Sequence, residues 1–191
     1  MKFLKIVIFV LIAIIVLLLL VALFLPSKYD IQRSVVMDCP QGNTFNLVAD
    51  FNNWLMWNPW TQIDTTAVSE VAGPVGEIGS SWSWSGEMVG TGSLTITEID
   101  SPRYISSELR FTQPRESVAE DIWIFEKTSE GTRVTWRNVG NLSYPVERYL
   151  GLFLENSILG PTFERGLQNL KNLCEEKYLM EQSVPEGDEL Q

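Results

Sequence analysis

The sequence predicts an α+β domain in which a curved antiparallel sheet closes around one long C-terminal helix. Residues 29–139 contain a series of strand-like runs separated by turn residues. The helix follows them, with an apolar stripe at spacings of four, three and four formed by Phe163, Leu167, Leu170 and Cys174. A stripe of this kind is buried against another element. With the first 25 residues set aside, about 165 remain, which suits one domain with a sizeable core.

An apolar run precedes this domain. Ile6 to Leu25 contains twenty apolar residues without interruption, and at about 1.5 Å per residue such a helix crosses a hydrocarbon core of roughly 30 Å. A cleaved signal peptide is the alternative, but its apolar region usually has about 7–15 residues and is followed by small residues. This run ends in Phe24-Leu25-Pro26. We therefore expect an uncleaved transmembrane anchor within residues 1–27.

The charges beside the apolar run give its orientation only a slight bias. Lys2, Lys5 and the terminal amine precede the run, whereas Lys28 and Arg33 follow it. Positive charge favours the cytoplasmic side of a membrane. We expect a single-pass protein with a cytoplasmic N-terminus and an extracytoplasmic domain, and a cytoplasmic domain is the alternative.

The domain is expected to begin with one strand and two helices. Residues 29–37 alternate between two faces, as a strand does. Pro40 can open a helix whose buried side contains Phe45. A short helix and loop over residues 50–60 then hold three tryptophans, and Asn58-Pro59 ends any helix there.

Six further strands are expected, joined by turns that contain Gly or Pro: 61–71, 80–85, 88–99, 103–112, 117–127 and 132–139. The alternation is clearest where Trp82 and Trp84 share one face and serines occupy the other. In the next strand, Gly90 and Gly92 share a face with Leu94. Two glycines there indicate a bend or room for the tryptophan rings.

The last part of the chain is expected to be helical. Residues 145–159 form a first helix that ends at Gly160, and Pro161 starts a new helix at its first turn, a kink in one continuous helix being the alternative. The domain is expected to span residues 28–178. Residues 179–191 are acidic and contain Pro185 and Gly187, which predicts a disordered tail.

Composition excludes several classes of function. The net charge of −10 argues against a nucleic-acid partner, because no cluster of Lys and Arg is available to displace counterions from phosphates. The chain contains no His, the residue that serves most often as general base at neutral pH and as zinc ligand. We predict no metal and no cofactor. The composition does not predict the oligomeric state.

The two cysteines, Cys39 and Cys174, are too few for a disulfide framework or a cysteine-based metal site. They lie at opposite ends of the domain sequence. One disulfide is possible, but we expect two separate buried thiols, because nothing local holds the two residues together.

The order of these motifs resembles the SRPBCC or START-like superfamily, in the branch of polyketide cyclases, dehydrases and lipid transport proteins. The resemblance covers about residues 28–178. It is carried by the early strand that leads into Pro40 and the helix of Phe45, and by the segments 54–60 (WLMWNPW), 82–86 (WSWSG), 90–92 (GTG), 131–136 (GTRVTW) and 163–171 (FERGLQNLK).

The resemblance implies a helix-grip fold, in which six or seven antiparallel strands wrap the C-terminal helix and leave a deep apolar cavity. Relatives bind lipids, sterols, polyketides or plant hormones, and some catalyse cyclisation or dehydration. The superfamily has no universal catalytic motif that could be transferred to this chain. It does not imply the N-terminal anchor.

Our first functional hypothesis is a membrane-tethered binding or carrier domain for an apolar small molecule or lipid. A tether raises the local concentration of a ligand that comes from the membrane. Aromatic side chains on the predicted inner face are the expected lining of the cavity, and core packing is the alternative role for each ring. These residues are Trp57, Trp60, Trp82, Trp84, Phe111, Trp123 and Trp136.

An enzyme of the cyclase or dehydratase type is the second hypothesis, and we expect binding rather than catalysis. Such an enzyme needs an acid, Tyr or Arg in the cavity, where burial raises the pKa of a carboxyl group. The acid and tyrosine candidates are Glu87, Glu108, Glu120, Asp121 and Tyr104. Alternation places Glu108 and Glu120 on the outer face, and we expect Asp121 at the rim. No pair of carboxylates at acid/base spacing stands out, so no catalytic residue is assigned.

A protein-interaction or stress-response module with a filled core is the third hypothesis. The cavity itself discriminates among the three. An open void of several hundred Å³ favours binding, whereas a sheet collapsed onto the helix favours an interaction role.

Overall fold

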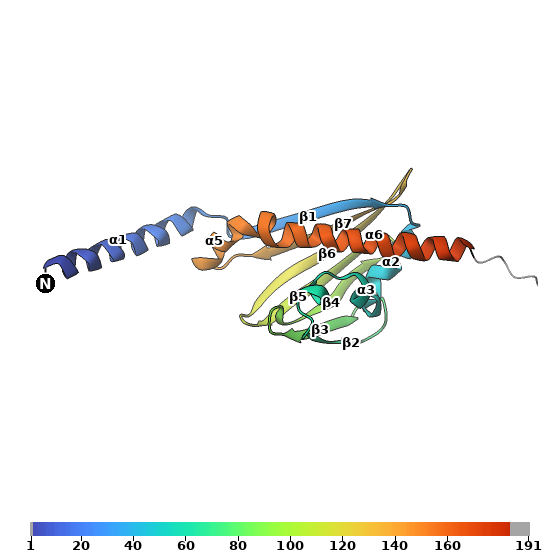
Figure 1. Ribbon diagram of the computed structural model, residues 1–191, viewed down its shortest axis with the longest axis horizontal. Helices are drawn as coiled ribbons and strands as arrows, with labels where there is room; N and C mark the ends of the chain where they lie inside the picture. Colours follow the sequence, from blue (N-terminus) through green and yellow to red (C-terminus); the bar gives the residue numbers. More distant parts are fainter. Residues whose placement is uncertain (1, 184–191) are drawn as a thin grey trace, which may run out of the picture.

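Figure 1 shows the computed structural model, which describes residues 2–183. Helix α1 (Lys2–Phe24) projects from a domain that begins with strand β1 (Lys28–Met37) and three short helices, α2 (Gln41–Ala49), α3 (Trp54–Trp57) and α4 (Trp60–Ile63). The remaining strands are β2 (Val68–Ala72), β3 (Ser81–Gly86), β4 (Gly90–Asp100), β5 (Tyr104–Gln113), β6 (Ser117–Thr128) and β7 (Gly131–Asn141). Helix α5 (Val146–Phe153), a π-helical segment η2 (Leu154–Leu159) and helix α6 (Gly160–Ser183) complete the described chain.

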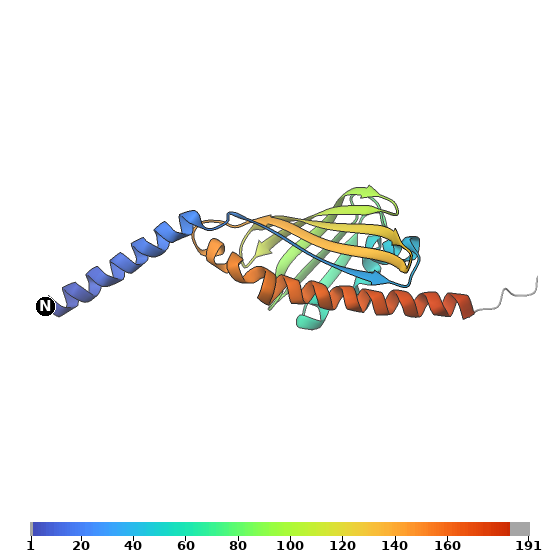
Figure 2. The same ribbon diagram turned by 90° about the horizontal axis from the view of Figure 1, so that it is seen from above.

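The strands form one antiparallel sheet in the order β1-β7-β6-β5-β4-β3-β2. Strand β1 pairs with β7, so the first and last strands are neighbours. Helices α2 and α6 pack on one face of the sheet, and Figure 2 shows α6 running along it. The α+β helix-grip architecture predicted from the sequence is confirmed.

Strand β2 is shorter than expected, because residues predicted as strand form helix α4 and a turn. The turn is organised by Asp64, a buried carboxylate whose Oδ1 accepts hydrogen bonds from the backbone N and Oγ1 of Thr66 at 3.0 and 2.6 Å. Polar side chains that bond to the backbone two residues later favour turns over strands. The other predicted strands are confirmed with ends that differ by a few residues.

The chain around Pro161 has features of both predicted alternatives, a new helix and a kink in one continuous helix. Helix α6 begins as a separate element at Gly160, but Leu154 and Gly160 both have right-handed helical dihedrals, so the helical path continues through η2. Helix α6 reaches Ser183 and therefore includes residues 179–183 of the predicted tail. The rest of that tail, residues 184–191, lies outside the described residues.

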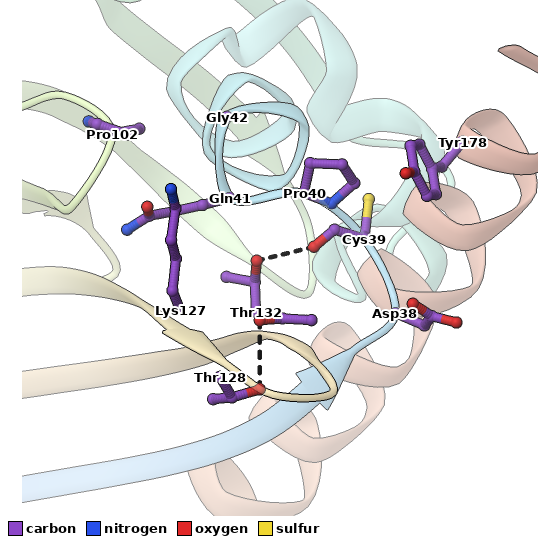
Figure 3. Close-up of a pocket in the computed structure, with 11 residues that line it drawn as sticks. Asp38, Cys39, Pro40, Gln41, Gly42, Pro102, Lys127, Thr128, Thr132 and Tyr178 are labelled. Carbon is purple, nitrogen blue, oxygen red and sulfur yellow. Dashed lines mark hydrogen bonds between the residues drawn. The ribbon is translucent and has the colours of Figure 1, made fainter. Parts of the chain in front are cut away.

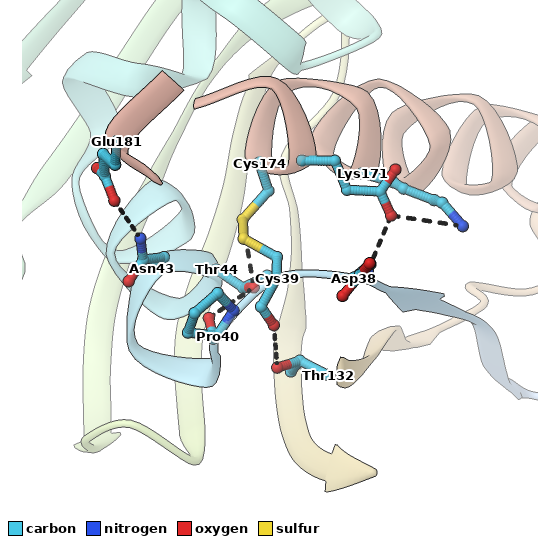
Figure 4. Close-up of a disulfide and its surroundings, with 10 residues drawn as sticks. Asp38, Cys39, Pro40, Asn43, Thr44, Thr132, Lys171, Cys174 and Glu181 are labelled. Carbon is cyan, nitrogen blue, oxygen red and sulfur yellow. Dashed lines mark hydrogen bonds and ion pairs between the residues drawn. A yellow bond between two sulfur atoms is a disulfide. The ribbon is translucent and has the colours of Figure 1, made fainter. Parts of the chain in front are cut away.

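Cys39 and Cys174 form a disulfide with an S–S distance of 1.98 Å (Figure 4). The expectation of two separate thiols is wrong. Strand β1 and helix α6 lie side by side, and the Nζ of Lys171 on α6 donates to the backbone O of Val36 at 3.0 Å. Cys39, just after β1, therefore meets the buried face of α6 despite a sequence separation of 135.

Candidate ligand cavity

A cavity of about 350 Å³ lies between the sheet and the helices. Its volume falls in the range of roughly 300–1,000 Å³ that is typical of small-molecule sites. The wall is mostly apolar and is built by Trp54, Trp60, Ile63, Trp82, Trp84, Met88, Val89, Leu94, Leu109, Phe111, Trp136, Leu154, Leu159 and Phe163. Three polar side chains, Tyr29, Asp121 and Asn138, complete it. The side chains of the sheet and the helices thus leave an open cavity between them.

The seven rings predicted to line a cavity fall into two groups. Five of them line it: Trp60, Trp82, Trp84, Phe111 and Trp136. Trp57 and Trp123 are not in the lining and are only 0% and 1% exposed. These two rings pack edge to face with centroids 5.6 Å apart. They form the packed core behind the cavity.

Two apolar lining rings, Trp54 and Phe163, were not among the predicted site residues. Trp54 stands in the same cluster as Trp57, three residues earlier, so the spacing in a short helix could have indicated either ring. Phe163 begins the apolar stripe of α6 and stacks on Trp136 with centroids 4.3 Å apart. The stripe shows that Phe163 is buried, but it does not distinguish a cavity wall from a packed core.

Gly92 leaves space for the ring of Trp84 because it has no side chain. The two residues are directly paired between β3 and β4, and a Cβ atom on Gly92 would lie 2.6 Å from Cζ2 of Trp84. Real Cβ atoms do not approach so closely, so a larger residue at position 92 would displace the ring. The sequence prediction of room for a tryptophan is confirmed at Gly92. Gly90, with φ of +69°, instead serves the turn before β4.

One wall of the cavity contains a network of hydrogen bonds around Asp121. Oδ1 of Asp121 accepts from Nε1 of Trp136 at 2.9 Å and from Nδ2 of Asn138 at 3.1 Å. Oδ2 accepts from Nε1 of Trp123 at 3.0 Å. The hydroxyl of Tyr29 donates to Oδ1 of Asn138 at 2.8 Å. Each of these donors has a partner, so the carboxyl group is held in one orientation.

Burial dominates the electrostatics of this network. Asp121 is 4% exposed, and desolvation raises the pKa of its carboxyl to about 6, against the opposing effect of the hydrogen bonds from Trp136, Asn138 and Trp123. Desolvation and the nearby charge of Asp121 raise the pKa of Tyr29 to about 12. The tyrosine therefore stays a neutral donor, while Asp121 can change its protonation state near neutral pH.

Asp121 was expected at the rim and is found buried in the wall. Asn138 on β7 pairs directly with Asp121, and Tyr29 on β1 pairs with Gly140, two residues further along β7. Their side chains cover the carboxyl, and Tyr29 comes from the first strand of the domain, which is distant from Asp121 in the sequence. The sequence pattern placed Asp121 on the correct face and could not show this cover.

The other acidic candidates lie outside the cavity. Exposed Glu120 accepts a hydrogen bond from the hydroxyl of Ser106 at 2.7 Å, and Glu108 pairs with Arg110 at 2.9 Å. These contacts confirm the outer-face placement of Glu108 and Glu120. Glu87 is exposed, and Tyr104 is not among the lining residues.

The rim of the cavity comes from η2 and from the turn between β3 and β4. Hydrogen bonds in a π-helix run from residue i to i+5, so Leu154 and Leu159 lie about one turn apart on the same side and both reach the cavity. In the turn between β3 and β4, Oδ2 of Asp64 accepts from the backbone N of Met88 at 2.7 Å and of Val89 at 3.2 Å. Hydrogen bonds from Thr66 and then from Met88 lower the pKa of Asp64 to about 2, so its charge holds this turn throughout the neutral range.

A second depression, of about 400 Å³, lies at the opposite end of the domain beside the disulfide (Figure 3). Its polar groups are used within the protein. The hydroxyl of Thr132 donates to the backbone O of Cys39, and Nε2 of Gln41 donates to the backbone O of Phe125, both at 2.8 Å. This depression is open, and its buried polar side chains Gln41 and Thr132 already have partners within the protein. Within residues 2–183, no group of three His, Cys, Asp or Glu side chains could hold a metal ion.

The fold and cavity define a helix-grip domain of the ligand-binding type. Residues 28–175 match the family described as polyketide cyclase / dehydrase and lipid transport, and the chain belongs to this family. No curated protein matches the sequence significantly.

Solved structures share the fold at low sequence identity. The di-domain ARO/CYC StfQ from the steffimycin biosynthetic pathway aligns with a TM-score of 0.62 and 13% identity over 80% of this chain and 52% of that chain. An uncharacterised protein from Rhizobium leguminosarum aligns with a TM-score of 0.58 and 15% identity, covering 78% of this chain and 95% of the other. The Aha1 dimer from Colwellia psychrerythraea gives 0.53 and 12%, with 77% and 96% covered. These likenesses establish the fold.

Proposed function

We propose that this protein is a membrane-tethered binding or carrier domain for an apolar small molecule or lipid that has one polar end. The observation that carries the proposal is the buried carboxyl of Asp121 in the wall of an otherwise aromatic cavity. Small-molecule sites combine an apolar lining with a few polar groups that fix the orientation of the ligand. Asp121 and its neighbours are such a group.

The hydrogen bonds of Asp121 indicate what the polar end contains. Oδ1 accepts two hydrogen bonds from the protein, whereas Oδ2 accepts one, from Trp123. A carboxylate oxygen has about two acceptor sites, so Oδ2 can accept one more. A ligand hydroxyl or amine would supply the donor, and the remainder of the ligand would contact the rings of Trp60, Trp84 and Phe111.

Two features support the tether and its orientation. Helix α1 is long and apolar enough to cross a membrane, by length and composition. The disulfide between Cys39 and Cys174 supports an extracytoplasmic domain, because disulfides persist in oxidising compartments and are rare in the cytosol. A ligand released from the bilayer would then meet the cavity on the outer side.

The test compares three forms of the full-length chain in phosphatidylcholine nanodiscs: the native protein, Leu109→Trp and Thr112→Trp. Leu109 lines the cavity, so the indole would occupy its space, whereas Thr112 is an exposed residue of the same strand and serves as the matched control. The readouts are the binding of the neutral fluorescent amine N-phenyl-1-naphthylamine and mass spectrometry of molecules extracted with organic solvent.

We expect Leu109→Trp to weaken probe binding by about tenfold or more, which corresponds to about 1.4 kcal/mol. A molecule that copurifies with the native chain and Thr112→Trp should be depleted in Leu109→Trp. The amount of lipid that only surrounds the anchor should be equal in all three samples, so it does not affect the comparison of their extracts. Equal probe binding and equal extracts from three folded proteins would overturn the proposal.

A cyclase or dehydratase is the second candidate function, and the pKa of about 6 for Asp121 is the observation that favours it. A buried carboxyl with that pKa can exchange a proton at neutral pH. It is the one carboxyl group among the described lining residues, so a two-carboxylate mechanism has no second member there. If copurified material is converted by the native chain and remains unconverted but bound in Asp121→Asn, the enzyme is the correct assignment. If neither protein converts the material, the assignment as a binding domain stands.

A further inference from the structure

The end of α1 is joined to α5, and to the residues just before it, by specific side-chain contacts. The hydroxyl of Tyr149 donates to the backbone O of Leu18 at 2.6 Å, and the hydroxyl of Tyr144 donates to the backbone O of Leu19 at 2.9 Å. Helix α5 therefore lies beside the last two turns of α1. Figures 1 and 2 show α5 at the end of the domain from which α1 projects.

Arg148 completes this junction by capping α1. Its Nη1 donates to the backbone O of Ala22 at 3.0 Å and of Leu23 at 3.4 Å. The last four carbonyls of a helix have no partner within the helix, and a cation near them interacts favourably with the helix dipole. The last turn of α1 has no basic residue of its own, so Arg148 supplies this charge. The contact fixes α5 at the depth of the C-terminal end of the apolar run.

The same short helix carries an apolar stripe that no part of the described protein covers. Val146, Leu150 and Phe153 recur at spacings of four and three, which place them on one face of α5. They are 60%, 54% and 59% exposed. Three large apolar side chains on one exposed helix face indicate an interaction surface.

We infer that α5 is an interfacial helix that rests on the bilayer, with Val146, Leu150 and Phe153 in the boundary between headgroups and acyl chains. The inference rests on the proposed membrane anchoring of α1. The occupant of the stripe is lipid because α5 is bonded to the end of the anchor, whose own apolar side chains are exposed beside it. Interfacial helices bury their apolar face roughly 5–10 Å into the boundary between headgroups and acyl chains. Tyr is enriched at this level, and Tyr and Arg both serve as interfacial anchors.

This placement gives the cavity an entrance that faces lipid. Segment η2 follows α5 directly, and its Leu154 and Leu159 form part of the cavity rim. A helix held in the interface therefore holds the rim at the membrane surface. An apolar molecule can pass from the acyl chains to the aromatic wall without crossing bulk water.

The charge of the protein indicates that α5 does not need anionic lipids to bind a bilayer. Helix α5 contains one Arg and one Glu, and the whole chain has a net charge of −10. Anionic lipids attract basic segments, so they add nothing to the binding of α5. Neutral phosphatidylcholine is the appropriate bilayer for the test.

The experiment measures the depth of single positions in the full-length chain reconstituted in phosphatidylcholine vesicles. An environment-sensitive fluorophore is attached through Leu150→Cys or, separately, Phe153→Cys, and its fluorescence is measured with lipids that carry a quencher near the headgroup or deep in the acyl chain. Leu179→Cys is the matched control, because Leu179 is 65% exposed at the far end of α6. Leu17→Cys reports on the anchor itself. The native disulfide is kept, and circular dichroism verifies the fold of each variant.

We expect loss of fluorescence with the shallow quencher at positions 150 and 153, loss with the deep quencher at position 17, and no loss at position 179. If position 17 is quenched and positions 150 and 153 behave like position 179, the interfacial helix is wrong while the anchor stands. If position 17 is not quenched at all, the proposed anchoring fails, and the inference fails with it. Quenching at positions 150 and 153 that appears only with anionic lipid would overturn the hydrophobic contact argued above.

Discussion

The two ends of the space between the sheet and helix α6 differ in how they are filled. At the end away from α1, the disulfide joins Cys39 to α6, the hydroxyl of Thr44 lies 3.4 Å from Sγ of Cys174, and Oε1 of Glu175 accepts from the backbone N of Asp38 at 2.8 Å (Figure 4). At the end near α1, the same helix borders the cavity through Phe163. One helix is therefore clamped at its C-terminal half and borders open space at its N-terminal half.

The C-terminal half of α6 therefore contributes to stability, and its N-terminal half borders the space for a ligand. Packing and a covalent link hold α6 at the clamped end, so the cavity at the other end can stay open without loss of the fold. The rings show a second division between packed and open surroundings. Trp57 and Trp123, behind the cavity, are packed on all sides, whereas Trp84 and Trp60 face the cavity.

Truncation of a packed ring should cost more than truncation of a lining ring. Trp57→Ala removes a fully buried indole and should lower the free energy of unfolding by about 3–5 kcal/mol. Trp84→Ala should lower it by less, because one side of that ring already lacks contacting atoms. Chemical unfolding followed by tryptophan fluorescence measures both, and Trp57→Phe provides a milder version if the alanine variant does not fold. A greater loss for Trp84→Ala than for Trp57→Ala would contradict the division.

Removal of the disulfide should weaken the clamp and leave the cavity intact. The double variant Cys39→Ala/Cys174→Ala should lower the free energy of unfolding by about 2–5 kcal/mol, since the bond closes a long loop in the unfolded chain. Calorimetry of the oxidised native chain and the variant gives the difference. Binding of N-phenyl-1-naphthylamine, measured well below the unfolding transition, should be unchanged. Loss of probe binding in the folded variant would show that the two ends are coupled.

The buried carboxyl should make stability depend on pH in the direction opposite to most acidic residues. The pKa of Asp121 is about 6 in the folded protein and about 3.9 in an unfolded chain, so the folded state binds the proton more tightly. Its contribution is fully present below about pH 4 and is lost as the pH rises through 6, by about 2–3 kcal/mol in total.

The measurement is the free energy of unfolding of the native chain and Asp121→Asn between pH 4 and 7. The difference between the two should change across this interval, while contributions from other carboxyl groups, such as Asp64 with its pKa of about 2, remain common to both. A constant difference would show that Asp121 does not titrate in this range.

Much of the fold follows from local patterns in the sequence. The alternation of Trp82 and Trp84 with serines predicts β3, and the stripe from Phe163 to Cys174 predicts α6, because side chains repeat every two residues in a strand and every 3.6 in a helix. The uninterrupted apolar run predicts the long helix α1 for a different reason, because its length suits a helix that crosses a membrane. Each of these signals needs only the residues of one element, so the sequence alone contains them.

The features of the site depend instead on residues that are distant in the sequence. The disulfide requires β1 to lie beside α6, and the burial of Asp121 requires Tyr29 and Asn138 from other strands. Whether a ring such as Trp57 or Trp84 faces packed core or open cavity depends on how far the sheet curves away from the helix. A periodic pattern shows which face is buried, but the shape of the space against that face exists only in the tertiary structure.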